Sequence, residues 1–325
     1  MKIRTLLVMF GLFATTALSA AALSAAEPAT ETTEKSAPFG DAKRVLFLGD
    51  SITHAGHFIT LIEAQLLMRD GRAPEMINLG LPSETCSGLS EPAHPFPRPD
   101  VHERLDRALK RAEADVVVVC YGMNDGIYYP FSRDRFLAYQ KGIEKLVAKV
   151  HASGATLIVM TPPAFDPLPL KKAGKLKPAG AAEYAWFEIY EGYDDVLKEY
   201  AKWVVGREDK RVSKTIDLHT PVTEYVAKKR KTNADFTMSP DGVHVNQEGH
   251  AVLASAILKS LAVEEAALPD DLVSLVGQRQ KLLHDSWLSH VGHKRPGVAP
   301  GLALDEARKK AEVITAKIDE LLKAK

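Results

Sequence analysis

Residues 45–53 read VLFLGDSIT, an apolar run that passes directly into a small polar turn. Two further runs are apolar throughout, VVVV at 116–119 and LIVM at 157–160. Such runs are typical of a parallel sheet with helices on both faces, because its strands are buried from two sides. Weaker strands are expected at 75–79 and 212–218.

Segments with helical periodicity lie between these runs. Helices are expected over 58–67, 101–112, 136–150 and 250–261. Asp100, Ser132 and Asn246 precede three of them and can cap their first turns. Gly71 and Gly154 can end two of them. The alternation of strands and helices predicts right-handed crossovers and a doubly wound α/β domain.

The composition is that of an ordinary globular protein. Of 325 residues, 46 % are hydrophobic and 26 % are charged, which excludes a largely disordered or fibrous chain. The 42 basic residues equal the 42 acidic ones, so the net charge gives no reason to expect a nucleic acid partner. Two cysteines are too few for a disulfide framework or a four-thiolate zinc site. Whether Cys86 and Cys120 form one disulfide or remain buried thiols is left open.

The N-terminus has the organisation of a signal peptide over residues 1–26. Lys2 and Arg4 are basic, an apolar run follows, and small residues precede a cleavage position after Ala26. The run is too short for a spanning helix, so we expect a periplasmic or secreted protein without stable membrane insertion after cleavage. Residues 27–40, rich in Thr, Glu and Pro, are expected to be a flexible linker.

Residues 265–325 are expected to form a helical C-terminal extension. Apolar residues at helical spacing over 302–322 predict an amphipathic helix, which would pack on the domain or on a partner and would allow a homo-oligomer. Within the extension, segment 284–296 contains histidines, a tryptophan and an arginine that could bind a sugar. Packing of Trp287 and Leu288 on the core is the favoured interpretation of that segment.

Polar motifs follow the expected strands. Gly-Asp-Ser at 49–51 follows the first strand, Gly80 follows the second, and Gly-Met-Asn-Asp at 122–125 follows the third. Asp-Gly-Val-His at 241–244 precedes a capped helix. In an open parallel sheet, ligands bind beyond the carboxyl ends of the strands, where these motifs are expected to meet.

The four blocks, in this order, resemble those of the SGNH (GDSL-type) hydrolase/esterase family. A lone Gly-Asp-Ser would carry little weight, but the four together are specific. The resemblance implies a flavodoxin-like sheet of about five parallel strands flanked by helices. It also implies a hydrolase domain over residues 41–264, with the C-terminal extension outside the blocks.

The residue types suit nucleophilic catalysis. A serine hydroxyl needs a base to take its proton, and a histidine suits that role near neutral pH. Ser51 is the expected nucleophile, His244 the general base and then acid, and Asp241 the carboxylate that orients the imidazole. The resemblance assigns the oxyanion hole to the backbone N–H groups of Ser51 and Gly80 and to the side-chain amide of Asn124.

Each block also has a structural alternative. Ser51 could only cap a helix, and Asn124 could only form an Asx-turn. His54, beside the nucleophile, could line the acyl pocket or only begin a helix. Thr53 stands where the nucleophile elbow of an α/β-hydrolase requires glycine, which disfavours that plan.

These observations predict an exported serine esterase that needs no metal or cofactor. Its expected substrate is an acyl ester of a carbohydrate, an acetyl ester in particular, hydrolysed through an acyl-enzyme. A lysophospholipase or thioesterase acting on longer acyl chains is one alternative. A non-catalytic glycan-binding module of the same fold is another.

Overall fold

The computed structural model describes residues 38–324, and the expected signal peptide at 1–26 lies outside them. Five parallel strands form one sheet in the order β2-β1-β3-β4-β5. The strands are β1 (Arg44–Gly49), β2 (Glu75–Asn78), β3 (Val116–Cys120), β4 (Thr156–Met160) and β5 (Lys214–Ile216). This order is that of a flavodoxin-like, doubly wound sheet, so the predicted fold class is confirmed.

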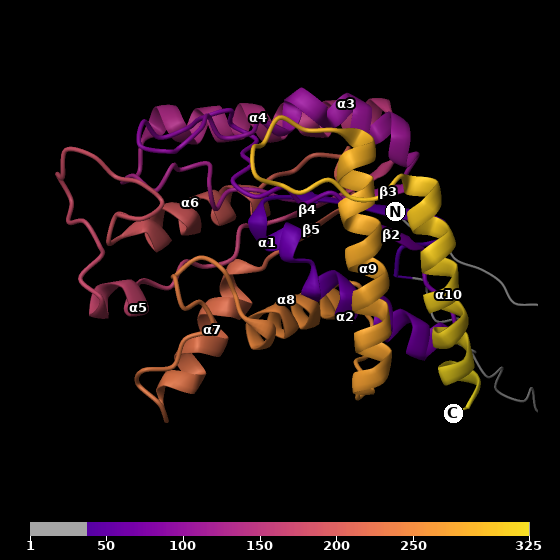
Figure 1. Ribbon diagram of the computed structural model, residues 1–325. Helices are drawn as coiled ribbons and strands as arrows, with labels where there is room; N and C mark the ends of the chain where they lie inside the picture. The colour runs from indigo at the N-terminus through magenta and orange to yellow at the C-terminus, as the bar shows by residue number, and fades with distance from the viewer. Residues whose placement is uncertain (1–37, 325) are drawn as a thin grey trace, which may run out of the picture. The chain divides into compact units, whose positions relative to one another are not determined.

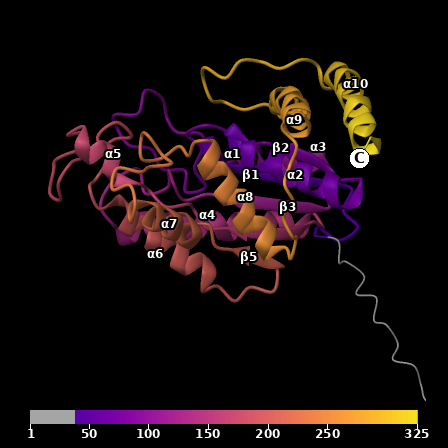
Figure 2. The same cartoon turned by 90° about the horizontal axis from the view of Figure 1, so that it is seen from below.

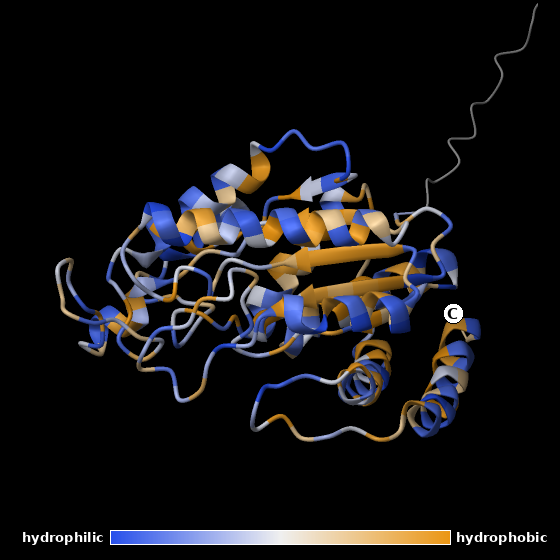
Figure 3. Cartoon of the chain, turned by 90° about the horizontal axis from the view of Figure 1, so that it is seen from above, coloured by the Kyte–Doolittle hydropathy of each residue, from blue (hydrophilic) through white to orange (hydrophobic). Residues whose placement is uncertain are grey.

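Helices cover both faces of the sheet. They are α1 (Ser51–Ala55), α2 (His57–Asp70), α3 (Val101–Ala112), α4 (Arg133–Ala152), α5 (Pro167–Lys172), α6 (Tyr193–Val205), α7 (His219–Arg230), α8 (Gln247–Ser260), α9 (Asp270–Val291) and α10 (Leu304–Lys323). Figure 1 shows α3 and α4 on one face and α2 and α8 on the other. The strands between these layers are hydrophobic along their length, whereas the helices carry mixed faces (Figure 3).

The expected capping residues begin their helices. The Asp100 side chain accepts a hydrogen bond from the His102 N–H at the start of α3, and Asn246 accepts one from Gly249 N–H at the start of α8. The Ser132 side chain accepts a hydrogen bond from the Arg135 N–H at the start of α4. The strands pair in register, with Gly49 at the end of β1 opposite Cys120 at the end of β3. The turns that follow these two strands therefore leave the sheet side by side.

Helix α9 covers the outer edge of β2. Gln280 Nε2 donates to the carbonyl oxygen of Met76 (3.2 Å), and His284 Nδ1 donates to that of Asn78 (2.8 Å). These carbonyl groups belong to the edge strand, which would otherwise present them unpaired. Trp287 is 2 % exposed and Leu288 is 1 % exposed, so both pack on the core as the favoured interpretation holds.

Helix α10 packs against α9 and α2 within the same chain. Leu67, Leu272, Val276 and Ile318 form part of a small apolar cluster between these helices. The expected amphipathic helix is therefore present, with its apolar face turned toward α9. The connection between α9 and α10 does not take the shortest path and extends toward the side of α1 (Figures 1 and 2).

Three further expectations have outcomes in residues 38–324. Phe39, in the expected linker 27–40, is 8 % exposed and joins the core, so the end of that segment packs on the domain. Cys86 and Cys120 are both free and buried, which resolves the open question against a disulfide. No helix in this part of the chain has the length and apolarity needed to cross a membrane.

Candidate active site

Strand β1 leads directly into the turn that carries Ser51. The Asp50 side chain accepts a hydrogen bond from the Ile52 N–H (2.9 Å) and so caps α1, of which Ser51 is the first residue. A Cβ atom at Gly49 would lie 2.8 Å from the carbonyl oxygen of Cys120, closer than such atoms approach in proteins. Only glycine lets the turn pass this close to β3. The helix-cap alternative for Ser51 is therefore wrong, because Asp50 is the cap.

Ser51, His244 and Asp241 lie in hydrogen-bonded sequence. His244 Nδ1–H donates to Asp241 Oδ2 (2.6 Å), which leaves His244 Nε2 to accept from the Ser51 hydroxyl (2.8 Å). The other oxygen of Asp241 accepts the backbone N–H groups of Val243 (3.0 Å) and His244 (2.7 Å). The carboxylate is thus held by the backbone of the same turn. This arrangement brings together the side chains expected to be nucleophile, base and orienting acid.

The local environment shifts the pKa values of Asp241 and His244 in opposite directions. Burial opposes ionisation of Asp241, but hydrogen bonds from His244 outweigh it and lower its pKa to about 2. The hydrogen bond to Asp241 raises the pKa of His244 above its ordinary 6.5, against partial burial. Asp50 is buried beside them, and burial raises its pKa to about 7. A carboxylate that stays ionised therefore raises the pKa of the imidazole that it orients.

With His244 as the general base that the sequence predicts, we expect hydrolysis to slow in acid as its imidazole becomes protonated. The imidazole can accept a proton from Ser51 only when it is neutral. Because the pKa of His244 is raised, the imidazole stays protonated, and so unable to act as a base, up to a higher pH. The limb of kcat/KM against pH should therefore have its midpoint above 6.5, with about a tenfold loss per pH unit below it.

Two variants assign that limb. Asp241→Asn removes the carboxylate that raises the His244 pKa, so the midpoint should move to lower pH in whatever activity remains. Asp50→Asn keeps a capping oxygen and removes the neighbouring carboxyl group, whose pKa is raised to about 7, so it should keep the limb with only a small downward shift. Disappearance of the limb in Asp50→Asn would assign the titration to Asp50 instead.

Asn124 lies opposite the nucleophile and is 3 % exposed. The Tyr128 hydroxyl donates to its Oδ1 (2.8 Å), and its Nδ2 donates to the carbonyl oxygen of Glu84 (3.1 Å). These two bonds set the orientation of the amide, and the second hydrogen on Nδ2 remains for a ligand in the cleft. Asn124 is thus placed where the sequence predicts an oxyanion donor.

Gly80 is placed differently from the expectation. Its N–H donates to Asn78 Oδ1 (2.8 Å), and Gly80 is not among the residues that line the cleft in front of Ser51. A Cβ atom here would lie 2.7 Å from the Cα of His54, so glycine is required for the close approach of this loop to α1. The structure therefore gives Gly80 a packing role and does not bring its N–H toward the nucleophile.

Ser83 occupies the position expected of Gly80. It lines the cleft together with Ser51 and Asn124, and its backbone is left-handed with φ 68°. No acceptor for its N–H is present among the described residues. Sequence reasoning missed this residue because a serine with positive φ has no signature in the sequence, where glycine is expected.

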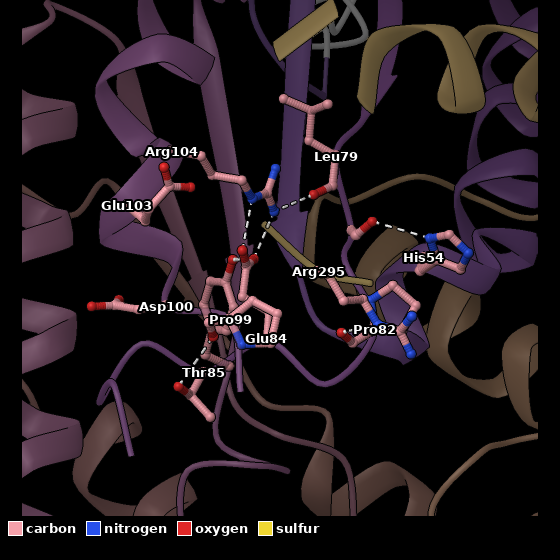
Figure 4. A network of polar contacts seen from close by, with 12 residues as sticks. His54, Leu79, Pro82, Glu84, Thr85, Pro99, Asp100, Glu103, Arg104 and Arg295 are labelled. Atoms are coloured by element: carbon pink, nitrogen blue, oxygen red, sulfur yellow. Dashed lines mark hydrogen bonds and ion pairs between the residues drawn. The ribbon is translucent and has the colours of Figure 1, made fainter. Parts of the chain in front are cut away.

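A buried ion pair supports this loop from behind. Arg104 Nε and Nη2 donate to the two carboxylate oxygens of Glu84, both at 2.6 Å, and Nη2 also donates to the carbonyl oxygen of Leu79 (2.6 Å) (Figure 4). The Tyr121 hydroxyl donates to the same carboxylate (2.7 Å). Since the Glu84 carbonyl oxygen accepts from Asn124, the pair connects α3 to both sides of the cleft. The sequence contains no local signal for this contact.

His54 is held by the C-terminal extension. His284 Nδ1 donates to Asn78, so its Nε2 accepts from His54 Nδ1 (2.9 Å), which also lies 3.2 Å from the carbonyl oxygen of Gly80 (Figure 4). Burial lowers the pKa of His284 to about 4, so the pair is neutral near pH 7. His54 is not among the residues lining the cleft, which decides against its acyl-pocket role.

The cleft in front of Ser51 has a volume of about 410 Å3. The loop after β2 contributes Pro82, Ser83, His94, Pro95, Phe96 and Arg98; the segment after β4 contributes Leu170, Lys175, Trp186 and Phe187. Trp186 is 50 % exposed and Phe187 is 48 % exposed. Arg295 comes from the extension. Much of this lining lies in loops whose contribution the sequence does not reveal.

Several solved structures resemble this chain in fold at low sequence identity. A gut microbial diltiazem-metabolizing enzyme matches with a TM-score of 0.51 and 18 % identity, over 68 % of this chain and 47 % of that one, so the chain spans about half of that enzyme. An acetylxylan esterase from Geobacillus stearothermophilus has a TM-score of 0.47 at 19 % identity, covering 70 % and 98 % of the two chains. A further acetyl xylan esterase has a TM-score of 0.46 at 20 % identity, covering 66 % and 98 %.

No curated protein matches the chain in sequence. Residues 47–252 match the sequence profile of the GDSL-like Lipase/Acylhydrolase family. The match begins within β1 and ends within α8, and it includes the nucleophile turn, the loop after β2, Asn124 and the Asp241–His244 turn. The match covers more than half of the chain, and the resemblance seen in the four sequence blocks is confirmed. The protein belongs to the GDSL-like lipase/acylhydrolase family.

Proposed function

We propose that the protein is an exported serine esterase that removes acetyl groups from carbohydrate. The observation that carries the proposal is the hydrogen-bonded sequence from Ser51 through His244 to Asp241 at the mouth of the cleft. Ser51 follows β1, which lies between β2 and β3 in the sheet. The strand order reverses at β1, and ligands of doubly wound sheets bind at such a position.

The first half of the reaction forms an acyl-enzyme. The Ser51 oxygen attacks the ester carbonyl carbon while its proton passes to His244 Nε2. The backbone N–H groups of Ser51 and Ser83 and the Asn124 amide stabilise the negative oxygen of the tetrahedral intermediate. The bond to the alcohol oxygen then breaks, and His244 returns the proton to that oxygen as the alcohol leaves.

The second half repeats these steps with water. His244 takes a proton from water, the resulting hydroxide attacks the acyl carbon, and the bond to Ser51 breaks with return of the proton to the serine. Throughout, Asp241 stays ionised, because its pKa is lowered to about 2, and stabilises the imidazolium form of His244. The acid and the alcohol are the only products, so the cycle balances without a further reactant.

The character of the cleft supports a sugar ester as the substrate. Trp186 and Phe187 present half-exposed aromatic rings at its edge, and their faces can cover the C–H face of a sugar ring. Polar groups of His94 and Ser83 lie in the same lining and can bind hydroxyl groups. A cleft built from a few polar groups and aromatic surfaces is typical of small-ligand sites.

A longer acyl chain is the second candidate substrate. Phe96, Leu170 and Val243 join the two aromatic residues in the lining, and together they offer an apolar surface that an acyl chain could occupy. The protein would then be a lysophospholipase or thioesterase of the same reaction type.

Acetate release from a panel of acetylated polysaccharides tests the proposal, with Ser51→Ala as the negative control. The panel should be accompanied by p-nitrophenyl esters of two to twelve carbons. We expect acetate release from at least one polysaccharide and the highest kcat/KM with the two-carbon ester. A preference for long chains, with no acetate released from polysaccharide, would favour the second candidate. Failure of a fluorophosphonate probe to label Ser51 would favour a non-catalytic glycan-binding module.

The export signal can be tested separately. Full-length protein produced in a bacterial host should be recovered outside the cytoplasm, and its N-terminal residue should be Glu27 if cleavage follows Ala26. Recovery of intact protein in the cytoplasm would contradict the proposed periplasmic or secreted location.

A further inference from the structure

Arg295 reaches the catalytic cleft from outside the family region. It lies in the connection between α9 and α10, beyond residue 252, where the family match ends. Its Nε donates to the carbonyl oxygen of Pro82 (2.9 Å), and its Nη1 donates to that of Pro296 (2.6 Å). Figure 4 shows Arg295 beside Pro82. Pro82 belongs to the loop after β2, which continues into Glu84. The extension thus places a guanidinium in the wall of the cleft that holds Ser51.

The position of this guanidinium is well defined. Its central carbon lies 5.2 Å from the centre of the Phe96 ring, so the aromatic face supports the cation from one side. The carbonyl oxygens of Pro82 and Pro296 fix its plane. An arginine held in this way loses little conformational freedom when a ligand binds, which favours binding of an anionic group.

Arg295 has no carboxylate partner among residues 38–324. The described ion pairs do not include it, whereas Arg98 in the same lining is bound through two nitrogens to the buried carboxylate of Glu91 (2.6 and 2.7 Å). Its remaining N–H groups have no described acceptor. A cation left without a counter-charge in a concave site attracts anions from solution.

The other charged groups of the cleft do not cancel this cation. Asp241 is the one carboxylate in the lining, and it is hydrogen-bonded to His244. Lys175, from the segment after β4, is a second cation in the lining, and it is absent from the described ion pairs. The excess of positive charge in a site with a single, engaged carboxylate indicates an anionic ligand.

We propose that Arg295 is a specificity-determining residue that binds an anionic group on the sugar carrying the ester. The ligand chemistry is a carboxylate, as in a uronic acid, or a sulfate ester, and the two are distinguished by the test below. This inference rests on the proposed carbohydrate esterase function and names the class of sugar. The C-terminal extension would then determine which sugar is accepted, while the Ser51 site performs the hydrolysis.

Three methyl glycosides acetylated at the same ring hydroxyl test the proposal. They differ only in the group attached to C5, which is CH2OH in the neutral sugar, a carboxylate in the uronic acid and CH2OSO3⁻ in the sulfate ester. At low ionic strength, we expect kcat/KM for one of the anionic sugars to exceed that for the neutral sugar by roughly 10- to 100-fold, the range for a hydrogen bond to a charged group. The anion with the larger rate identifies the source of the charge.

Variants of Arg295 separate recognition from structural support. Arg295→Gln should abolish the preference, because kcat/KM for the anionic sugar should fall roughly 10- to 100-fold further than kcat/KM for the neutral sugar. Arg295→Lys keeps the charge without the planar fork and should retain an intermediate preference. Lys317→Gln, an exposed lysine on α10, removes one positive charge outside the cleft and should leave the preference unchanged.

A salt titration of the wild type needs no variant. Raising the ionic strength from 0.01 to 1 M shortens the screening length from about 30 Å to about 3 Å, so the preference for the anionic sugar should shrink. The neutral sugar should show little change. A preference that does not respond to salt would contradict an electrostatic origin.

The outcomes distinguish this inference from the function on which it rests. Equal rates for neutral and anionic sugars would overturn the role of Arg295 and leave the carbohydrate esterase proposal standing. An equal loss for all sugars in Arg295→Gln would also overturn it, because it would show a structural role. If none of the sugars is hydrolysed while p-nitrophenyl acetate is, the carbohydrate proposal itself fails.

Discussion

Ser51→Ala is expected to lower kcat for p-nitrophenyl acetate by about 10⁶-fold, the cost of losing the nucleophile in a serine hydrolase triad. In the proposed mechanism the hydroxyl oxygen bonds to the acyl carbon, and it lies 2.8 Å from His244 Nε2. No neighbouring side chain in the described cleft presents a second activated hydroxyl to this imidazole. The residual rate should come from substrate binding and oxyanion stabilisation alone.

The fold should survive this substitution. Helix α1 is capped by Asp50, whose side chain bonds to the Ile52 N–H, so removal of the Ser51 hydroxyl leaves the cap intact. Thermal unfolding of Ser51→Ala should therefore match that of the wild type within a few degrees. Ser260→Ala, at the end of α8 and outside the cleft, is the matched control and should keep full activity. Unchanged hydrolysis by Ser51→Ala would refute the mechanism.

Arg104→Met is expected to lower the free energy of unfolding by about 3–5 kcal/mol. Arg104 is 1 % exposed and Glu84 is fully buried, so loss of the guanidinium strands a carboxylate away from water. The carbonyl oxygen of Leu79 loses its donor as well. Urea or thermal unfolding measures the change, and kcat should fall too, because Glu84 helps to orient Asn124.

An exposed ion pair provides the comparison. Lys149 Nζ pairs with Asp106 on the surface between α3 and α4, and Lys149→Met should cost only about 0–1 kcal/mol. Arg104→Met combined with Glu84→Gln removes the stranded charge and should recover part of the lost stability. If Arg104→Met costs no more than Lys149→Met, the buried pair does not support the loop as we infer.

The sheet could be predicted from the sequence because its signals are local. Each central strand is a short run that is apolar at every position, and each expected cap lies next to the helix that it begins. The five strands, their parallel order and the covering helices agree with that prediction. Several boundaries shifted by a few residues, as at β5 and α4, and Phe39 joins the core in a segment whose composition indicated a linker.

The site was predicted in part. Ser51, Asn124, Asp241 and His244 each lie in a short motif, and the shared edge of a parallel sheet implied their convergence, which the structure shows. The expected role of Gly80 fails because the direction of an N–H group depends on the path of the whole loop. The Gly80 N–H is bonded to Asn78, and Ser83 is the residue of this loop that lines the cleft.

The sequence by itself determined the class of fold, the family and the set of groups that can transfer an acyl chain, because motif, periodicity and capping act over a few residues. Only the tertiary structure decided which residue of the loop after β2 lines the cleft, which ion pair supports that loop, and that Arg295 joins the cleft from the C-terminal extension. Arg295 contacts Pro82 across 213 residues of sequence. A contact over such a distance depends on how helices pack, and no local pattern encodes it.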